Sequence, residues 1–285
     1  MIWVVGSHGM LGKELCEYFR GNAVQFVGTD KECDITDLQA LNNYSKDKNI
    51  NWIINCSAYT AVDKAEDESE AAFKLNEEGA YNLAIVAENI GAKIIYISTD
   101  YVFGGKGSEP HKVDDPVNPL GVYGQSKVAG EYAVKEMSRH YFIIRTSWLY
   151  GKYGNNFVTT MIRKFKEIEF LNVVNDQRGC PTWTYNLTEA IYCIVKNDLD
   201  KYGVYHFSNR GEITWYEFAL EIYRLALQKG IINKKVEINP VSSDMYPSKV
   251  KRPSYSVLDL DKITIFKDIK LSDWKESLNK YLDLI

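Results

Sequence analysis

Five short apolar runs in the first 150 residues alternate with longer stretches of helical periodicity. The runs span residues 2–5, 24–28, 52–56, 93–97 and 141–145, and helical stretches include 10–19, 38–44 and 66–89. Strands that are apolar at nearly every position are typically buried on both faces, and strands that alternate with helices form parallel sheets. The alternation therefore predicts an α/β fold with a doubly wound parallel sheet, covered by helices on both sides.

Glycines follow the first run at the spacing Gly6-x-x-Gly9-x-x-Gly12. The first permits a tight turn, the second lets the backbone approach a pyrophosphate, and the third allows close packing of helix on strand. The helix that follows offers its free N–H groups to the phosphates. The pattern indicates the dinucleotide site of a Rossmann fold, which we predict to contain Gly6, Gly9, Met10, Leu11 and Gly12.

Asp30 ends the second strand, 18 residues beyond Gly12, where an acidic side chain binds the adenosine ribose hydroxyls. A carboxylate there disfavours the additional phosphate of NADP, whereas the neighbouring Lys31 offsets that bias, so the choice between NADH and NADPH stays open. Tyr59 is explained equally well by packing within its loop. The further predicted cofactor contacts are Asp34, Ile35, Ala58, Tyr59, Thr60 and Ile97.

The alternation loosens after Gly151. Short strands are expected at 171–174 and 203–207, and helices at 155–166, 186–195 and 214–228. We predict a dinucleotide-binding domain over residues 1–150, to which a segment near 203–210 returns. Residues 151–285 are predicted to form mainly a smaller C-terminal α/β substrate-binding region.

Tyr123 and Lys127 lie four residues apart on a predicted helix, so both side chains reach one site. A nearby ammonium favours phenolate, so Lys127 is expected to lower the pKa of Tyr123 from its ordinary value of about 10. A tyrosine tuned in this way can protonate a carbonyl oxygen while a nicotinamide reduces its carbon. The same spacing also occurs on solvated helix faces, but its order after the glycine pattern favours an oxidoreductase.

Several longer motifs extend beyond these features. They span residues 55–66 (NCSAYTAVDKAE), 98–104 (STDYVFG), 119–127 (PLGVYGQSK) with Gly130-Glu131, 145–151 (RTSWLYG), 175–182 (NDQRGCPT) and 252–259 (RPSYSVLD). In these motifs the chain resembles the extended short-chain dehydrogenase/reductase superfamily. Within that superfamily it is similar to the dTDP-4-dehydrorhamnose reductases, nearly from end to end.

The resemblance implies an NADPH- or NADH-dependent reduction of a dTDP-4-keto-6-deoxysugar for polysaccharide biosynthesis. It implies that Tyr123 is the general acid and that Lys127 binds the nicotinamide ribose and lowers the Tyr123 pKa. Thr99 would hydrogen-bond the sugar carbonyl oxygen as charge develops on it. The implied substrate contacts are Val62, Thr99, Asp100 and Trp148.

The resemblance leaves alternatives of different kinds. Dehydratases of this superfamily carry a glutamate where this chain has Tyr101, which disfavours elimination, and a sugar 4-epimerase is disfavoured more weakly. A reductase that gives the 6-deoxytalose product and a non-catalytic NADP-binding regulatory subunit also stay open. Asp176 and Gln177 are expected with equal weight to contact substrate or to shape their loop.

Some relatives hold magnesium through glutamates, and Glu14 and Glu189 lie near two of those positions, but no third ligand can be assigned. Surface helical glutamates explain both residues more simply. The oligomeric state stays open, a homodimer included.

A net charge of −4 does not indicate binding to nucleic acid or to an anionic membrane, because both attract basic proteins. No apolar run approaches the roughly 20 residues that cross a bilayer. A strand that begins at Ile2 leaves no room for a signal peptide, and the five cysteines lack paired or ligand-type spacing. We therefore expect a cytoplasmic protein whose cysteines are reduced.

Overall fold

A six-stranded parallel sheet forms the centre of the computed structural model, which describes residues 1–246 and 248–285. The strand order is β10-β5-β4-β3-β1-β2, and all five pairings are parallel. The strands are β1 (Ile2–Val5), β2 (Phe26–Thr29), β3 (Trp52–Asn55), β4 (Lys93–Thr99), β5 (Tyr141–Thr146) and β10 (Gly203–His206). This order confirms the predicted doubly wound parallel fold.

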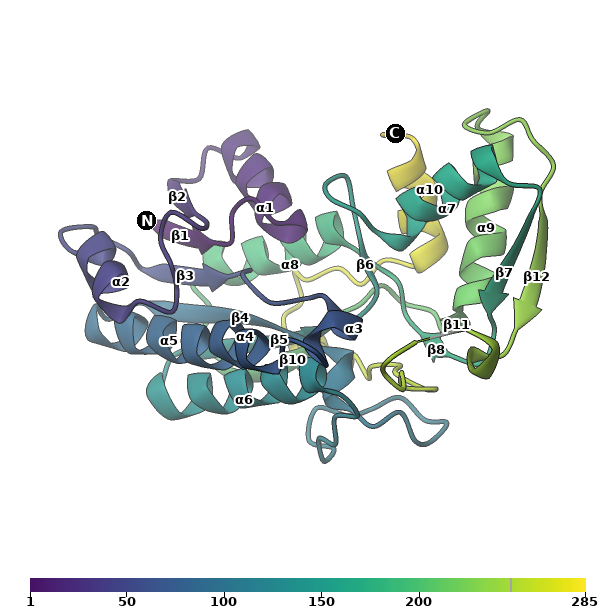
Figure 1. Ribbon diagram of the computed structural model, residues 1–285. Coiled ribbons are helices and arrows are strands. Elements are labelled where there is room, and N and C mark those ends of the chain that lie inside the picture. Colours follow the sequence, from purple (N-terminus) through teal and green to yellow (C-terminus); the bar gives the residue numbers. More distant parts are fainter. Residues whose placement is uncertain (247) are drawn as a thin grey trace.

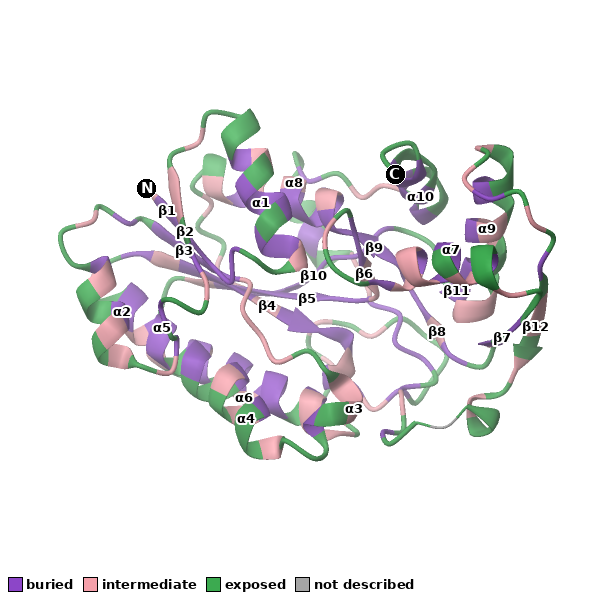
Figure 2. Cartoon of the chain, turned by 45° about the horizontal axis from the view of Figure 1, so that its top comes forward, coloured by how far each residue is buried: buried purple, intermediate pink, exposed green. Residues whose placement is uncertain are grey.

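Two layers of helices cover the sheet (Figure 1). On one face, Ile2 and Val4 pack with α1 (Met10–Gly21) and α8 (Thr184–Lys196). On the other face, Trp3 and Val5 pack with α2 (Leu38–Ser45), α5 (Gly79–Asn89) and the neighbourhood of α6 (Val122–Met137). Apart from the edge strand β2, the strands are largely buried and the outer helix faces are exposed (Figure 2). Burial from both sides explains the apolar character of these strands.

The helical stretch predicted over 66–89 is interrupted in the structure. After the single turn α3 (Val62–Ala65) come α4 (Ser69–Phe73), a π-helical turn at Lys74–Glu78, and α5. The carbonyl of Asn76, within the π turn, accepts a hydrogen bond from the Tyr96 hydroxyl of β4 at 3.1 Å. Such turns free a backbone group from the helical ladder, and here that group joins the helix to the sheet.

The second half of the chain builds a smaller region with its own core, on the right in Figure 1. Phe165, Phe218 and Leu278, from three different helices, are buried together in this core. Its helices are α7 (Phe157–Glu167), α9 (Trp215–Gln228) and α10 (Trp274–Leu282). Its strand pairs are β7 (Phe170–Val174) with β12 (Glu237–Val241), β8 (Arg178–Gly179) with β11 (Ile213–Thr214), and β6 (Leu149–Tyr150) with β9 (Thr182–Trp183).

The chain returns from this region to the large sheet. Leu187 and Ile191 of α8 are buried in the same core as α1, and β10 pairs with β5. The return therefore begins earlier than the predicted 203–210, because apolar side chains of α8 pack against the buried face of α1. The domain boundary at residue 150 stays a prediction.

Within the described residues, we found no helix with the length and apolar character that a membrane span requires.

Candidate active site

The glycine turn lies at the point where the strand order reverses, between the carboxyl ends of β1 and β3. Gly6 has a φ of +77°, and a Cβ there would lie 2.6 Å from the backbone nitrogen of Ser57 after β3. A Cβ on Gly12 would lie 2.1 Å from the Gly6 carbonyl oxygen. Both positions therefore require glycine, because neither space admits a side chain.

The N-terminus of α1 is suited to an anion. Its N-cap, Gly9, supplies no side-chain cap, and the first turn, which begins with Met10 and Leu11, carries no acidic residue. The free N–H groups of such a helix end, together with the helix dipole, bind phosphate. The turn therefore fits the pyrophosphate of a nicotinamide dinucleotide.

Asp30 lies beside this turn at the end of β2. Its carboxylate accepts hydrogen bonds from the backbone N–H groups of His8 at 2.9 Å and Lys31 at 3.0 Å. Asp34 forms a local turn by accepting from the N–H and hydroxyl of Thr36, both at 2.9 Å. Ile35 is buried beside Gly79 of α5, so its side chain supports the loop.

The predicted cofactor contacts Ala58, Tyr59 and Thr60 lie in the loop after β3. Ala58 and Tyr59 are half-buried and Thr60 is exposed. Asn76 fixes this loop: its side chain accepts from Tyr59 N at 2.8 Å and donates to Tyr59 O at 3.1 Å and to the Ser126 hydroxyl of α6 at 2.9 Å. Asn76 was missed in the sequence, because its role depends on the π turn. It joins the loop beside the glycine turn to the helix of Tyr123.

Tyr123 and Thr99 come together where α6 meets the end of β4. Burial strongly raises the pKa of Tyr123, and hydrogen bonding with Thr99 opposes only part of that rise. Thr99 is buried, and its hydroxyl donates to the Asp100 carboxylate at 3.1 Å while accepting from Tyr101 N at 3.2 Å. Tyr123 therefore stays a phenol at neutral pH and keeps a proton to donate.

The expectation that Lys127 lowers the Tyr123 pKa is wrong for this structure. The Lys127 ammonium donates to the Ile97 carbonyl oxygen at 2.7 Å and lies 4.0 Å from the centre of the Tyr96 ring. Burial lowers the pKa of Lys127 to about 7, so its charge is only partly present at neutral pH. Desolvation of the phenolate outweighs this weakened ammonium.

Asp100 is buried, and only one of its two carboxylate oxygens accepts a hydrogen bond from Thr99. Its Oδ1 accepts from Thr99, whereas its Oδ2 has no hydrogen-bond partner among the residues that the structure describes, although the Ser256 side chain lies near the carboxylate. Burial raises its pKa to about 6. An unpaired buried carboxylate oxygen costs free energy, and such a group beside Thr99 is a candidate acceptor for a substrate hydroxyl.

Trp148 stacks on a second tryptophan between the two parts of the chain. Its backbone has a φ of +48°, which is uncommon for a bulky residue. Its ring stacks on Trp215, with centroids 3.5 Å apart, and a Cβ on Gly179 would lie 2.5 Å from the indole. Trp215 and the requirement for glycine at 179 were missed in the sequence, because only the fold brings them to Trp148.

The remaining predicted substrate contact, Val62, begins α3 and is half-buried. The next residue, Asp63, accepts from the Arg252 guanidinium at 3.0 Å. Tyr101 packs edge-on against Tyr123, with ring centroids 5.6 Å apart. The motif at 252–259 therefore reaches the same side of the site as α3, which the sequence alone did not reveal.

The acidic residues considered for magnesium do not assemble. Glu14 accepts from the Thr184 hydroxyl at 3.1 Å, and Glu189 accepts from the Asn186 amide at 3.3 Å. Across residues 1–246 and 248–285, no three His, Cys, Asp or Glu side chains are arranged to hold a metal ion.

Asp176 and Gln177 differ in their surroundings. The Asp176 carboxylate accepts from the Ser243 backbone N–H and hydroxyl, both at 2.9 Å, which ties two loops together. Gln177 is buried. These contacts favour a loop-shaping role for Asp176.

Comparison with known proteins agrees with this geometry. All of residues 1–285 match the family described as RmlD substrate binding domain. The spore coat polysaccharide biosynthesis protein SpsK of Bacillus subtilis is 38% identical over 99% of this chain and 96% of its own length. The dTDP-4-dehydrorhamnose reductase of Aggregatibacter actinomycetemcomitans is 37% identical over 96% of each chain.

Among solved structures, dTDP-4-dehydrorhamnose reductase from Bacillus anthracis in complex with NADP superimposes with a TM-score of 0.94. It is 39% identical over 100% of this chain and 99% of that chain. These matches confirm the resemblance predicted from the motifs. Over its full length, the chain belongs to the RmlD substrate binding domain family.

Proposed function

We propose that this protein reduces the carbon-four ketone of dTDP-4-dehydro-L-rhamnose to give dTDP-L-rhamnose, with NADPH or NADH as reductant. The observation that carries the proposal is the meeting of Thr99, Asp100 and Tyr123 at the end of β4, beside a glycine turn that admits no side chain. The names of the relatives supply the substrate class. Dinucleotide and sugar would approach this point from opposite sides.

The cofactor's fit rests on Gly6, Gly12 and the uncapped α1 terminus, which would hold its pyrophosphate. When bound, the nicotinamide supplies the hydride that carbon four receives. We propose that Lys127 and Asp30 orient the two riboses, Lys127 with the N–H groups that it does not donate to the Ile97 carbonyl. The protein itself must supply a proton to the oxygen of the carbon-four ketone and stabilise the negative charge that develops on that oxygen.

Tyr123 is the proposed proton donor. Its raised pKa keeps the phenol protonated, which is the form that a reduction needs. The Thr99 hydroxyl would donate a hydrogen bond to the same oxygen as negative charge develops on it. The Thr99 hydroxyl now donates to Asp100, so both hydroxyls would turn from their present partners to donate to the substrate oxygen.

The sugar would be held by groups on both parts of the chain. Asp100 offers a buried carboxylate oxygen to a hydroxyl, and Val62 offers an apolar surface. The Trp148 indole, fixed by Trp215 and Gly179, offers a rigid wall.

The proposal is tested with dTDP-4-dehydro-L-rhamnose generated in situ. We expect loss of reduced-nicotinamide absorbance that depends on both substrates, and dTDP-L-rhamnose as the product by NMR. Parallel assays with NADH and NADPH determine the cofactor preference. A 6-deoxytalose product would change the stereochemical assignment, and cofactor binding without turnover would favour the regulatory-subunit alternative.

Asp100→Asn should stabilise the protein while weakening substrate binding. Between about pH 4 and pH 6, Asp100 is largely protonated in the folded protein but ionised in the unfolded chain. Wild-type stability therefore falls as pH rises through that window. At pH 7 the variant is expected to gain about 1–3 kcal/mol of unfolding free energy. The KM for the sugar nucleotide should rise about tenfold or more, since a charged acceptor is lost.

Denaturant unfolding at pH 4, 5.5 and 7, combined with steady-state kinetics, measures both effects. The stability difference between variant and wild type should widen as pH rises and level off above about pH 7. A variant that is less stable than wild type at pH 7, with unchanged KM, would contradict the proposed role of Asp100.

A further inference from the structure

A buried ion pair lies behind the candidate site and includes none of its residues. Glu131 of α6 and Arg145 of β5 have side chains that are 2% and 3% exposed. Their contact is bidentate: Arg145 Nε and Nη2 donate to the two Glu131 oxygens at 2.8 and 2.7 Å. A two-pronged contact of this kind fixes orientation as well as distance.

The pair continues a row of contacts between α6 and β4. The Ser98 hydroxyl donates to Glu131 Oε1 at 2.6 Å, and the Lys127 ammonium donates to the Ile97 carbonyl at 2.7 Å. Tyr123 is hydrogen-bonded with Thr99, the next residue of the strand. Three successive strand residues are therefore held by residues at i, i+4 and i+8 of one helix face.

Arg145 extends the contacts across the sheet. It pairs in register with Ser98 on one side and with His206 of β10 on the other. Its Nη1 donates at 3.1 Å to the carbonyl of Val113, in the loop that precedes α6. Burial lowers the pKa of His206 to about 3, so His206 stays neutral and adds no charge.

A buried ion pair is weak evidence for a contribution to stability. Replacing a buried ion pair by apolar residues of similar volume is often neutral or stabilising, whereas removing one partner costs about 3–5 kcal/mol. What apolar side chains cannot reproduce is the bidentate geometry. A helix packed only by apolar contacts can shift along the strand, and such a shift would separate Tyr123 from Thr99.

We propose that the Glu131–Arg145 pair is a positioning device, which holds the Tyr123–Lys127 face of α6 in register with Thr99 at the end of β4. The inference rests on the proposed function, because Tyr123 is the group whose position matters for the reduction. Neither Glu131 nor Arg145 contacts the reacting atoms, so both act through α6.

The test replaces the three polar partners together, as Ser98→Ala/Glu131→Leu/Arg145→Met, so that none of them is left buried and unpaired. We expect the triple variant to fold and kcat to fall about 10- to 100-fold, as a displacement near 1 Å would cause. KM values should stay within about threefold, since the loss lies in the chemical step. Adding Tyr123→Phe should cause little further loss, because both changes act on the same proton donor.

Ser98→Ala alone is the milder companion variant, should the triple variant fail to fold. It removes one hydrogen bond and leaves the ion pair intact, so a fall in kcat of about two- to tenfold is expected. Amide hydrogen exchange over residues 122–128 should accelerate in either variant, whereas exchange in α5 should not.

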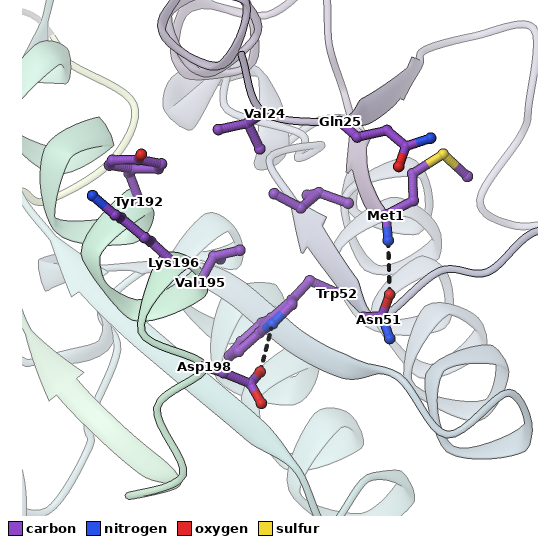
Figure 3. A pocket seen from close by; sticks show the side chains of 10 residues that line it. Met1, Val24, Gln25, Asn51, Trp52, Tyr192, Val195, Lys196 and Asp198 are labelled. Carbon is purple, nitrogen blue, oxygen red and sulfur yellow. Dashed lines mark hydrogen bonds between the residues drawn. The ribbon is translucent and has the colours of Figure 1, made fainter. Parts of the chain in front are cut away.

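A more exposed ion pair at the opposite end of the same strand serves as a control. Lys93, the first residue of β4, pairs with Asp198 at 2.8 Å, and Asp198 accepts from the Trp52 indole at 3.1 Å. Figure 3 shows Trp52 and Asp198 among the side chains that line a pocket at the amino edge of the sheet. The volume of this pocket is about 460 Å³. Lys93→Met/Asp198→Asn should change kcat less than about twofold, since it leaves the α6 face untouched.

The outcomes separate the two proposals. If wild-type protein reduces the 4-keto sugar and the variants retain its kcat, the positioning role is overturned while the proposed function stands. If the losses in the triple variant and Tyr123→Phe are fully additive, the pair does not act through Tyr123. If wild-type protein does not reduce the sugar, the proposed function fails, and unchanged exchange over 122–128 would then overturn the positioning role as well.

Discussion

Tyr123→Phe is expected to lower kcat for reduction of the 4-keto sugar by about 10²- to 10⁴-fold, the usual contribution of a positioned general acid. The substitution removes one hydroxyl from a half-buried residue and preserves the ring that packs edge-on against Tyr101. The affinity for NADPH should therefore change by no more than about threefold, since the glycine turn is untouched. Stopped-flow measurement of a single turnover, with cofactor binding followed by fluorescence, separates the two quantities.

Tyr132→Phe is the matched control, because Tyr132 lies on the same helix with its side chain 57% exposed. Its kcat should equal that of wild type. Near-normal turnover by Tyr123→Phe would exclude Tyr123 as the proton donor, whatever the effect on binding.

Gly12→Ala is expected to disable cofactor binding. The new Cβ would lie 2.1 Å from the Gly6 carbonyl oxygen and 2.8 Å from the Ser7 Cα, so the backbone itself must move. Overpacking of this kind costs about 1–3 kcal/mol of stability. Displacing the N–H groups that face the pyrophosphate should weaken NADPH binding by about 10²-fold or more, since hydrogen bonds to charged groups are lost.

Gly21→Ala provides the control at the other end of α1. A Cβ on Gly21 meets no atom within 4 Å, and alanine is favoured over glycine in a helix by about 1 kcal/mol. This variant should bind NADPH as wild type does and be slightly more stable. Calorimetric titration of both variants measures the affinities, and equal affinity in Gly12→Ala and wild type would contradict the assigned phosphate site.

The central sheet was predictable because its signals are local. The strands of the first 150 residues are apolar at most positions, and the helices between them have apolar stripes, so the alternation predicts a doubly wound sheet. The glycines at 6 and 12 were predictable for the same reason, since their spacing reflects one tight turn. Contacts between different elements were not predictable: Trp148 meets Trp215 only in the fold, and Glu131 meets Arg145 only where α6 packs on β5.

The electrostatics of the site show a second limit of sequence reasoning. The i, i+4 spacing of Tyr123 and Lys127 correctly placed both on one face of α6. Spacing carries no information about burial, however, and burial raises the pKa of Tyr123 while lowering that of Lys127 to about 7. The predicted direction of the Tyr123 pKa shift was therefore wrong. The predicted role of Tyr123 as proton donor is still possible, because a phenol with a raised pKa keeps its proton at neutral pH.

The destination of the hydride tests the proposed reaction most directly. Reduction of dTDP-4-dehydro-L-rhamnose with NADPH that carries deuterium at the transferable position of its nicotinamide should give dTDP-L-rhamnose labelled at carbon four alone, detectable by NMR. A product without deuterium at carbon four, or labelled at another carbon, would contradict the reduction that we propose for this site.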